Sequence, residues 1–83
     1  MNNEKIPIGA IFQHYKGKKY RVLMVGRHTE DLQPHVIYQG LYDCESFGKY
    51  PIWIRPLEMF LETVEMEGKK IPRFTLIELP VEE

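Results

Sequence analysis

Arg27, Arg55 and Arg73 are three of the four arginines, and each stands within two positions of an aromatic or imidazole side chain. These pairs are Arg27-His28, Trp53-Arg55 and Arg73-Phe74. A guanidinium group presents a planar fork of donors that suits a carboxylate or a phosphate, and an aromatic ring offers a face on which a base can stack. We therefore expect one shallow ligand-binding surface, built from Arg27, His28, Tyr38, Trp53, Arg55 and Arg73.

The same side chains have a purely structural interpretation, which the sequence leaves open. The acids Glu30, Glu58 and Glu62 are available to pair with the arginines inside the fold. Trp53 can equally belong to the core, with Arg55 stacked over an aromatic ring. The three arginines are thus either a site for an anion or internal ion pairs.

Other reactive side chains give weaker indications of chemistry. His14, His28 and His35 show neither H-x-x-x-H nor H-E-x-x-H spacing, so we expect no metal and no cofactor. Cys44 lies between two acidic residues, which disfavour a reactive thiolate, and we expect a passive surface cysteine. Among catalytic roles, only general-base catalysis by His28 is retained.

Composition excludes several classes of protein. A single cysteine allows no internal disulfide. The first ten residues contain no long apolar run, and no stretch approaches the roughly 20 apolar residues of a membrane helix, so we expect a cytoplasmic location and no membrane contact. The net charge of -1 gives no general attraction to nucleic acid, although residues 1–56 carry an excess of basic side chains. We expect one domain over 1–83, with an ordered core of about 8–79 between loose ends.

Alternation of apolar and polar side chains predicts strands over 19–27 and 35–43. In the first of them, Tyr20, Val22 and Met24 share the face that should meet the core. Shorter strands are predicted over 8–15 and 50–54, with a turn at 16–18, a loop at 28–34 and a connection at 44–49.

The last third of the chain is predicted to begin with one helical turn over 56–60, since proline is tolerated at a helix start. A hairpin should follow, in which 61–66 pairs with 73–79 across the EGKKIP loop. A helix over 57–66 is the competing interpretation. Short strands with closely spaced turns favour a mainly β fold: a small SH3-like barrel or a rolled antiparallel sheet, with at most one short helical turn. Closing the sheet would also remove its exposed edges.

Four motifs in a fixed order carry a resemblance to a known family. HYKG at 14–17, RHTE at 27–30, WxRP at 53–56 and PRF at 72–74 are each weak but jointly specific. In these motifs the chain resembles the small bacterial family of unknown function DUF1653, from about Gly9 to Ile77. Thr29 departs from the serine that is common in the RHTE loop. The resemblance implies a compact, mainly β domain, often a stand-alone protein, and it implies no activity.

These features favour a non-catalytic module that binds an anionic ligand, a peptide or nucleic acid. A nucleic-acid-binding small β-barrel is the first alternative, in which aromatic side chains stack on bases and basic side chains contact phosphates. A small enzyme that uses His28 as general base is the second. An enzyme is the less favoured class, because so short a chain offers little room for a cleft.

Overall fold

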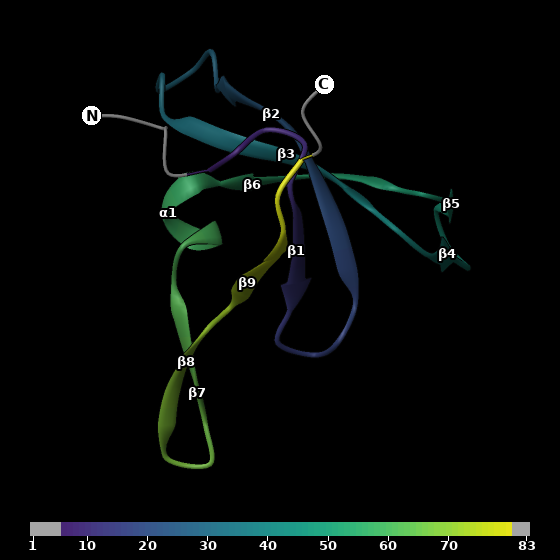
Figure 1. Cartoon of the computed structure of the whole chain (residues 1–83). Coiled ribbons are helices and arrows are strands. Elements are labelled where there is room, and N and C mark those ends of the chain that lie inside the picture. Colours follow the sequence, from purple (N-terminus) through teal and green to yellow (C-terminus); the bar gives the residue numbers. More distant parts are fainter. Residues whose placement is uncertain (1–5, 81–83) are drawn as a thin grey trace.

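The computed structural model describes residues 6–80, which form short strands and one helical turn (Figure 1). The strands are β1 (Ile11–His14), β2 (Lys19–Arg27), β3 (Pro34–Gly40), β4 (Asp43–Cys44), β5 (Gly48–Lys49), β6 (Ile52–Pro56), β7 (Thr63–Met66), β8 (Lys69–Pro72) and β9 (Phe74–Glu78), and the helical turn is α1 (Leu57–Phe60). Most of the expected loose ends, 1–5 and 81–83, fall outside the described residues, whereas Ile6 is buried in the core.

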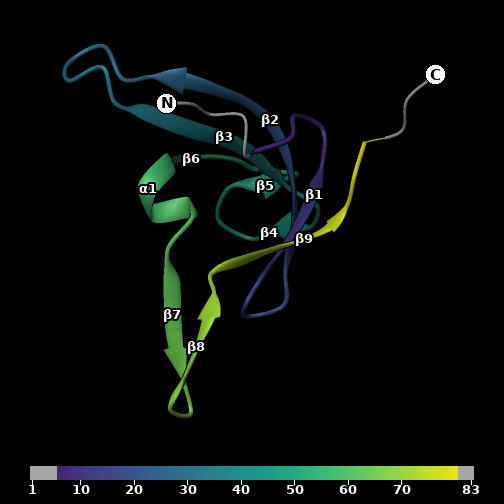
Figure 2. The ribbon, with the colours of Figure 1, turned by 60° about the vertical axis from the view of Figure 1, so that its left-hand side comes forward.

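The main sheet has five antiparallel strands in the order β6-β3-β2-β1-β9, and two separate hairpins, β4–β5 and β7–β8, extend from it. Both views show the β7–β8 hairpin pointing away from the strands of the main sheet (Figures 1 and 2). The mainly β prediction is confirmed. The sheet stays open, because β6 and β9 are its two edges and no hydrogen-bonded ladder joins them.

Strand β2 has the bounds that the alternation predicts, but its two faces exchange in the middle. The pairing of β2 with β3 shifts by one residue between Val22 and Met24, so Leu23 is an inserted bulge residue. As a result Val22 is buried, Met24 is 52% exposed and Val25 packs on the core instead. The expectation that Met24 meets the core was therefore wrong.

Strand β3 ends at Gly40, earlier than predicted, and brings Val36 and Tyr38 into the core. A Cβ atom on Gly40 would lie 2.6 Å from the ring of Tyr42, so only glycine lets this ring fold back over the strand. The predicted 44–49 connection contains the short β4–β5 hairpin, in which Cys44 is partly buried.

The helical turn at Leu57–Phe60 is confirmed, whereas the predicted hairpin partner was wrong. Thr63–Met66 pairs with Lys69–Pro72, and Phe74–Glu78 pairs with β1. The reason is a tight two-residue turn at Glu67 and Gly68, both at positive φ (52° and 81°), which matches the twist of a hairpin and closes it early. The competing helix over 57–66 was also wrong, because α1 ends at Phe60 and Thr63–Met66 forms β7.

The core is mostly aromatic. Phe60 from α1 stacks on Phe74 from β9 with ring centroids 4.2 Å apart, and Phe12 and Tyr38 meet Phe60 edge-on at 5.3 and 5.4 Å. Such ring pairs add about 0.5–1.5 kcal/mol each beyond the area they bury. The core therefore depends on contacts between β1, β3, α1 and β9. Between residues 6 and 80, no helix is long and apolar enough to cross a membrane.

Phe60→Ala should lower the free energy of unfolding by about 3–5 kcal/mol, because it opens a cavity among the rings of Phe12, Tyr38 and Phe74. Phe47→Ala is the matched control, since Phe47 is 68% exposed and contacts only the rim of the cluster through Trp53. Urea unfolding followed by tryptophan fluorescence measures both. Equal losses for the two variants would contradict this description of the core.

Candidate anion-binding site

The structure separates the six side chains that the sequence predicts to form one surface. Arg27 and His28 lie at the end of β2, beside the loop to β3. The other four project from β3, β6 and the β8–β9 junction, around the aromatic core: Tyr38, Trp53, Arg55 and Arg73. Their hydrogen bonds show what each group does.

Arg27 and His28 organise the loop after β2. The Arg27 guanidinium donates to the carbonyl oxygen of Leu32 at 2.8 Å, and His28 Nδ1 accepts the Glu30 amide at 3.1 Å. The His28 ring also lies 5.4 Å from the ring of His35. A surface hollow of about 190 Å³ adjoins both histidines. Arg27 is therefore occupied by the backbone of its own loop.

Three polar aromatic groups form a hydrogen-bonded chain along the rim of the core. Trp53 Nε1 donates to the Tyr42 hydroxyl at 3.1 Å, and the Tyr42 hydroxyl donates to that of Tyr20 at 3.0 Å. Burial raises the pKa of the Tyr20 phenol, and its hydrogen bond with Tyr42 raises this pKa further. Tyr20 thus keeps its proton and remains a hydrogen-bond donor at neutral pH.

Arg55 is held by one hydrogen bond and one ring. Its Nε donates to the Tyr38 hydroxyl at 3.0 Å, and its guanidinium carbon lies 5.7 Å from the centre of the Phe74 ring. Among residues 6–80, no carboxylate lies within 4.0 Å of this partly buried guanidinium. Arg55 is therefore a fixed positive charge without a counterion among residues 6–80.

Arg73 has a partner, but it also has an unused donor. Its Nη2 lies 3.1 Å from Glu62 Oε1, which confirms one of the internal ion pairs that the sequence allowed. Its Nε is buried, and no acceptor within the described part of the chain reaches it. Buried donors are nearly always paired, so an orphaned one needs an explanation.

His14, on β1, lies beside the positive charges of the site. Its ring lies 5.0 Å from that of Phe74, and its Nδ1 accepts the Lys16 amide at 3.1 Å, which leaves the proton on Nε2. Burial lowers the pKa of His14, and the charges of Arg55, Arg73 and Lys16 lower it further. His14 is therefore neutral and a donor at pH 7.

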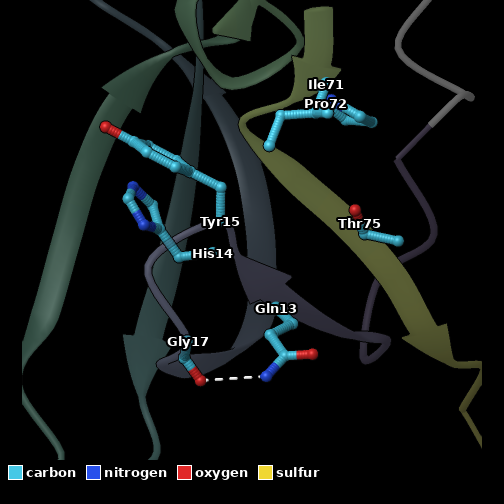
Figure 3. A pocket seen from close by; sticks show the side chains of 7 residues that line it. All are labelled: Gln13, His14, Tyr15, Gly17, Ile71, Pro72 and Thr75. Atoms are coloured by element: carbon cyan, nitrogen blue, oxygen red, sulfur yellow. Dashed lines mark hydrogen bonds between the residues drawn. The ribbon is translucent and has the colours of Figure 1, made fainter. Parts of the chain in front are cut away.

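A pocket of about 330 Å³ opens beside His14, between the β1–β2 turn and strands β8 and β9 (Figure 3). It is lined by Gln13, His14, Tyr15, Gly17, Ile71, Pro72 and Thr75. Figure 3 shows the His14 and Tyr15 rings lying together, with centroids 4.6 Å apart, and the Gln13 amide bonded to the Gly17 carbonyl at 3.0 Å. The pocket thus gives solvent access to the side of the sheet on which His14 lies.

We call the group formed by His14, Tyr20, Tyr38, Arg55 and Arg73 the arginine–tyrosine site. Its members present N–H and O–H donors, and Glu62 is the one carboxylate bonded to them within residues 6–80. No cluster of three or more His, Cys, Asp or Glu side chains suited to a metal ion occurs in the same described range. The site is therefore chemically matched to an acceptor-rich anion.

Sequence analysis missed His14 and Tyr20 as members of this site. A signal existed in each case: His14 begins the HYKG motif, and Tyr20 shares a face with Val22. The charges of Arg55 and Arg73 both lower the pKa of His14, whereas Arg27 is not among the charges that act on this ring.

Comparison with known proteins assigns the chain to a family. The model of the family described as "protein of unknown function (DUF1653)" matches residues 10–76 of the chain. The chain belongs to the DUF1653 family. A solved structure, the crystal structure of a protein belonging to DUF1653 from Bordetella bronchiseptica, is similar with a TM-score of 0.74 and 29% identity, over 90% of this chain and 92% of that chain. No protein with a curated description matches the chain. DUF1653 membership confirms the resemblance seen in the motifs and assigns no activity.

The electrostatics of the site can be measured through His14. Its pKa should lie below the ordinary value of 6.5, and Arg55→Gln should raise it by removing a nearby positive charge. Arg27→Gln is the control, because Arg27 is not among the charges that act on His14. Proton NMR titration of the imidazole resonances gives all three values. An unchanged His14 pKa in Arg55→Gln would show that Arg55 does not face this ring.

Proposed function

We propose that the protein is a non-catalytic binding module whose arginine–tyrosine site takes an anionic group from a ligand or partner. One observation carries the proposal: the partly buried Arg55 guanidinium has no carboxylate partner among residues 6–80. A charge removed from water is costly unless it is paired. An anion from outside the chain would supply the missing partner.

The geometry around Arg55 supports a carboxylate or phosphate in particular. Tyr38 and the Phe74 ring fix the guanidinium plane, which leaves both Nη groups for a bidentate contact. The Nε of Arg73, which has no acceptor within residues 6–80, and the Nε2 proton of His14 are further donors. Because these groups are fixed before the ligand arrives, little side-chain entropy is lost on binding.

His14 links this binding to pH. The empty site lowers its pKa, whereas a bound anion beside the ring favours the protonated form and raises that pKa. Proton uptake and anion binding therefore reinforce each other, and affinity should increase as pH falls through the pKa of His14.

We also infer the setting of this module from the sequence. We infer a bacterial protein that is located in the cytoplasm. We also infer that the strands of its rolled sheet are arranged as in an SH3 domain. The sheet order β6-β3-β2-β1-β9 and the short α1 before the last strands support that arrangement. The similar crystal structure from Bordetella bronchiseptica supports a bacterial setting.

Nucleic-acid binding is the second candidate, and one observation favours it. Phe47 and Tyr50 on the β4–β5 hairpin are 68% and 53% exposed, and Lys18 lies over the ring of Tyr42 at 4.7 Å. Exposed rings beside lysines suit stacked bases and phosphates. If nucleic acid is the ligand, affinity should fall steeply with salt, with a slope set by the number of phosphates contacted.

Arg55→Lys tests the leading proposal, because it keeps the charge and loses the planar fork. Titrations of the ¹⁵N-labelled protein with acetate and with inorganic phosphate should show affinity weakened about tenfold, the effect of roughly 1.4 kcal/mol. Arg27→Lys is the matched control and should bind like the wild type, since Arg27 donates to Leu32 instead. Urea unfolding should place both variants within about 0.5 kcal/mol of the wild type.

The opposite pattern would refute the proposal. If Arg55→Lys loses about 1 kcal/mol of stability or more while anion binding is unchanged, Arg55 is an internal strut against Tyr38 and Phe74.

A further inference from the structure

Among residues 6–80, no strand pairs with the outer edge of β6, which lies beside the proposed anion site. The Gly40 amide donates to the Pro51 carbonyl at 2.7 Å, which fixes the phase of the β3–β6 ladder. Bonded and non-bonded pairs alternate along an antiparallel ladder, so Trp53 and Arg55 turn their main-chain groups toward β3. Ile52 and Ile54 therefore point their N–H and C=O groups away from the sheet.

The two faces of β6 have different chemistry. Trp53 and Arg55 point inward, where Trp53 bonds to Tyr42 and Arg55 to Tyr38. Ile52 and Ile54 lie on the outer face and are 58% and 67% exposed. The two pairs thus alternate along β6, as successive side chains of a strand do.

The apolar side of β6 continues across the neighbouring strands. Met24 pairs with Ile37, and Ile37 pairs with Ile54, so three apolar side chains form one row on the outer face. Met24 and Ile54, at its two ends, are more than half exposed. A strand added at β6 would extend this row by one side chain.

We propose that the ligand is an extended peptide with alternating acidic and apolar residues, which adds to β6 as an antiparallel sixth strand. This inference rests on the proposed function, because the acidic residue opposite Arg55 provides the anion. Side chains directly opposite each other in a ladder lie about 4.5–5.5 Å apart at Cβ. The same register places an apolar peptide side chain beside Ile54, on the row that ends at Met24.

The hydrogen bonds of such a complex follow from the free edge. Ile54 would exchange its N–H and C=O with the peptide residue opposite it, which is an apolar one. The acidic residues would sit in the non-bonded pairs, where opposing side chains approach most closely. Main-chain bonds would give affinity, and Arg55 would select the acid, as in other cases of strand addition.

Charge argues against a second copy of this chain as the occupant. If two β6 strands paired antiparallel about Ile54, Arg55 would face Trp53 of the other copy, and the segment Ile52–Pro56 contains no acidic residue. Pro56 would also lack the N–H that the Ile52 carbonyl requires. A second β6 therefore fills the edge without neutralising Arg55, whereas an acidic peptide does both.

The test uses the peptide Ac-Glu-Ile-Glu-Ile-Glu-NH₂ with the whole protein. Calorimetry should detect binding, and replacing all three glutamates by glutamine should weaken it at least about tenfold. N-methylation at the two isoleucine nitrogens should abolish binding, because these donate to β6. N-methylation at two glutamate nitrogens is the matched control and should have little effect.

Two further readouts do not depend on modified peptides. Hydrogen exchange at the Ile52 and Ile54 amides should be fast in the free protein and at least about tenfold slower with peptide bound, because the added strand pairs them. Ile54→Lys places a charge on the apolar row and should weaken the peptide by a similar factor, while acetate binding at Arg55 stays unchanged.

The outcomes separate the two proposals. Binding that needs the glutamates and the free isoleucine N–H groups supports strand addition. Binding that needs the glutamates and tolerates methylation at isoleucine overturns strand addition and leaves the anion site standing. If Arg55 responds to none of the three ligands (acetate, phosphate and peptide), the proposed function itself is wrong. A concentration-dependent dimer that Ile54→Lys disrupts, with no peptide binding, assigns the β6 edge to a second copy and overturns the peptide.

Discussion

The stack of Phe60 on Phe74 holds the open sheet in its rolled shape. Phe60 follows β6 on the short α1 turn, and Phe74 begins β9, so the two rings join the opposite edges of the five-stranded sheet. A closed barrel would join such edges by a ladder of hydrogen bonds. Here side chains join them instead, and Arg55 from β6 reaches across to the same Phe74 ring.

This way of closing the fold accounts for the site. Because β6 and β9 do not pair, β6 has no strand partner on its outer side among residues 6–80, and Arg55 reaches from β6 to the Phe74 ring on β9. Glu62 is bonded to Arg73, and no carboxylate within residues 6–80 pairs with Arg55. Tyr38 and Phe74 fix the guanidinium, and His14 lies on the β1 side of the same rings. The unneutralised charge of Arg55 and the unpaired edge of β6 thus both follow from the open sheet.

What the sequence predicts well is local. The bounds of β2 follow from alternation, and the α1 turn follows from Pro56 and the residues after it, because neighbouring residues decide both. The bulge at Leu23 and the early closure of β7 on β8 depend on pairing and turn geometry, which alternation does not report. Without the bulge, Met24 was wrongly expected in the core, and without the early turn β9 was assigned the wrong partner strand.

The candidate site was predictable in part for the same reason. Arg55 and Arg73 attract attention by residue type and by their aromatic neighbours, and both lie near His14. His14 enters the site only because β1 pairs with β9, a long-range contact that spacing in the sequence does not encode. Arg27 looks equivalent to the other arginines in sequence, yet its own loop supplies the carbonyl oxygen of Leu32 as its acceptor.

The central claim is that Arg55 awaits an external anion, and its own Nε–H resonance tests this most directly. NMR resolves the Nε–H signals of the four arginines, Arg21, Arg27, Arg55 and Arg73, during a titration with acetate. The account predicts saturating shifts for Arg55 and Arg73, with Arg21 and Arg27 unmoved. Equal, non-saturating shifts at all four arginines would show only general screening by salt and would contradict the claim.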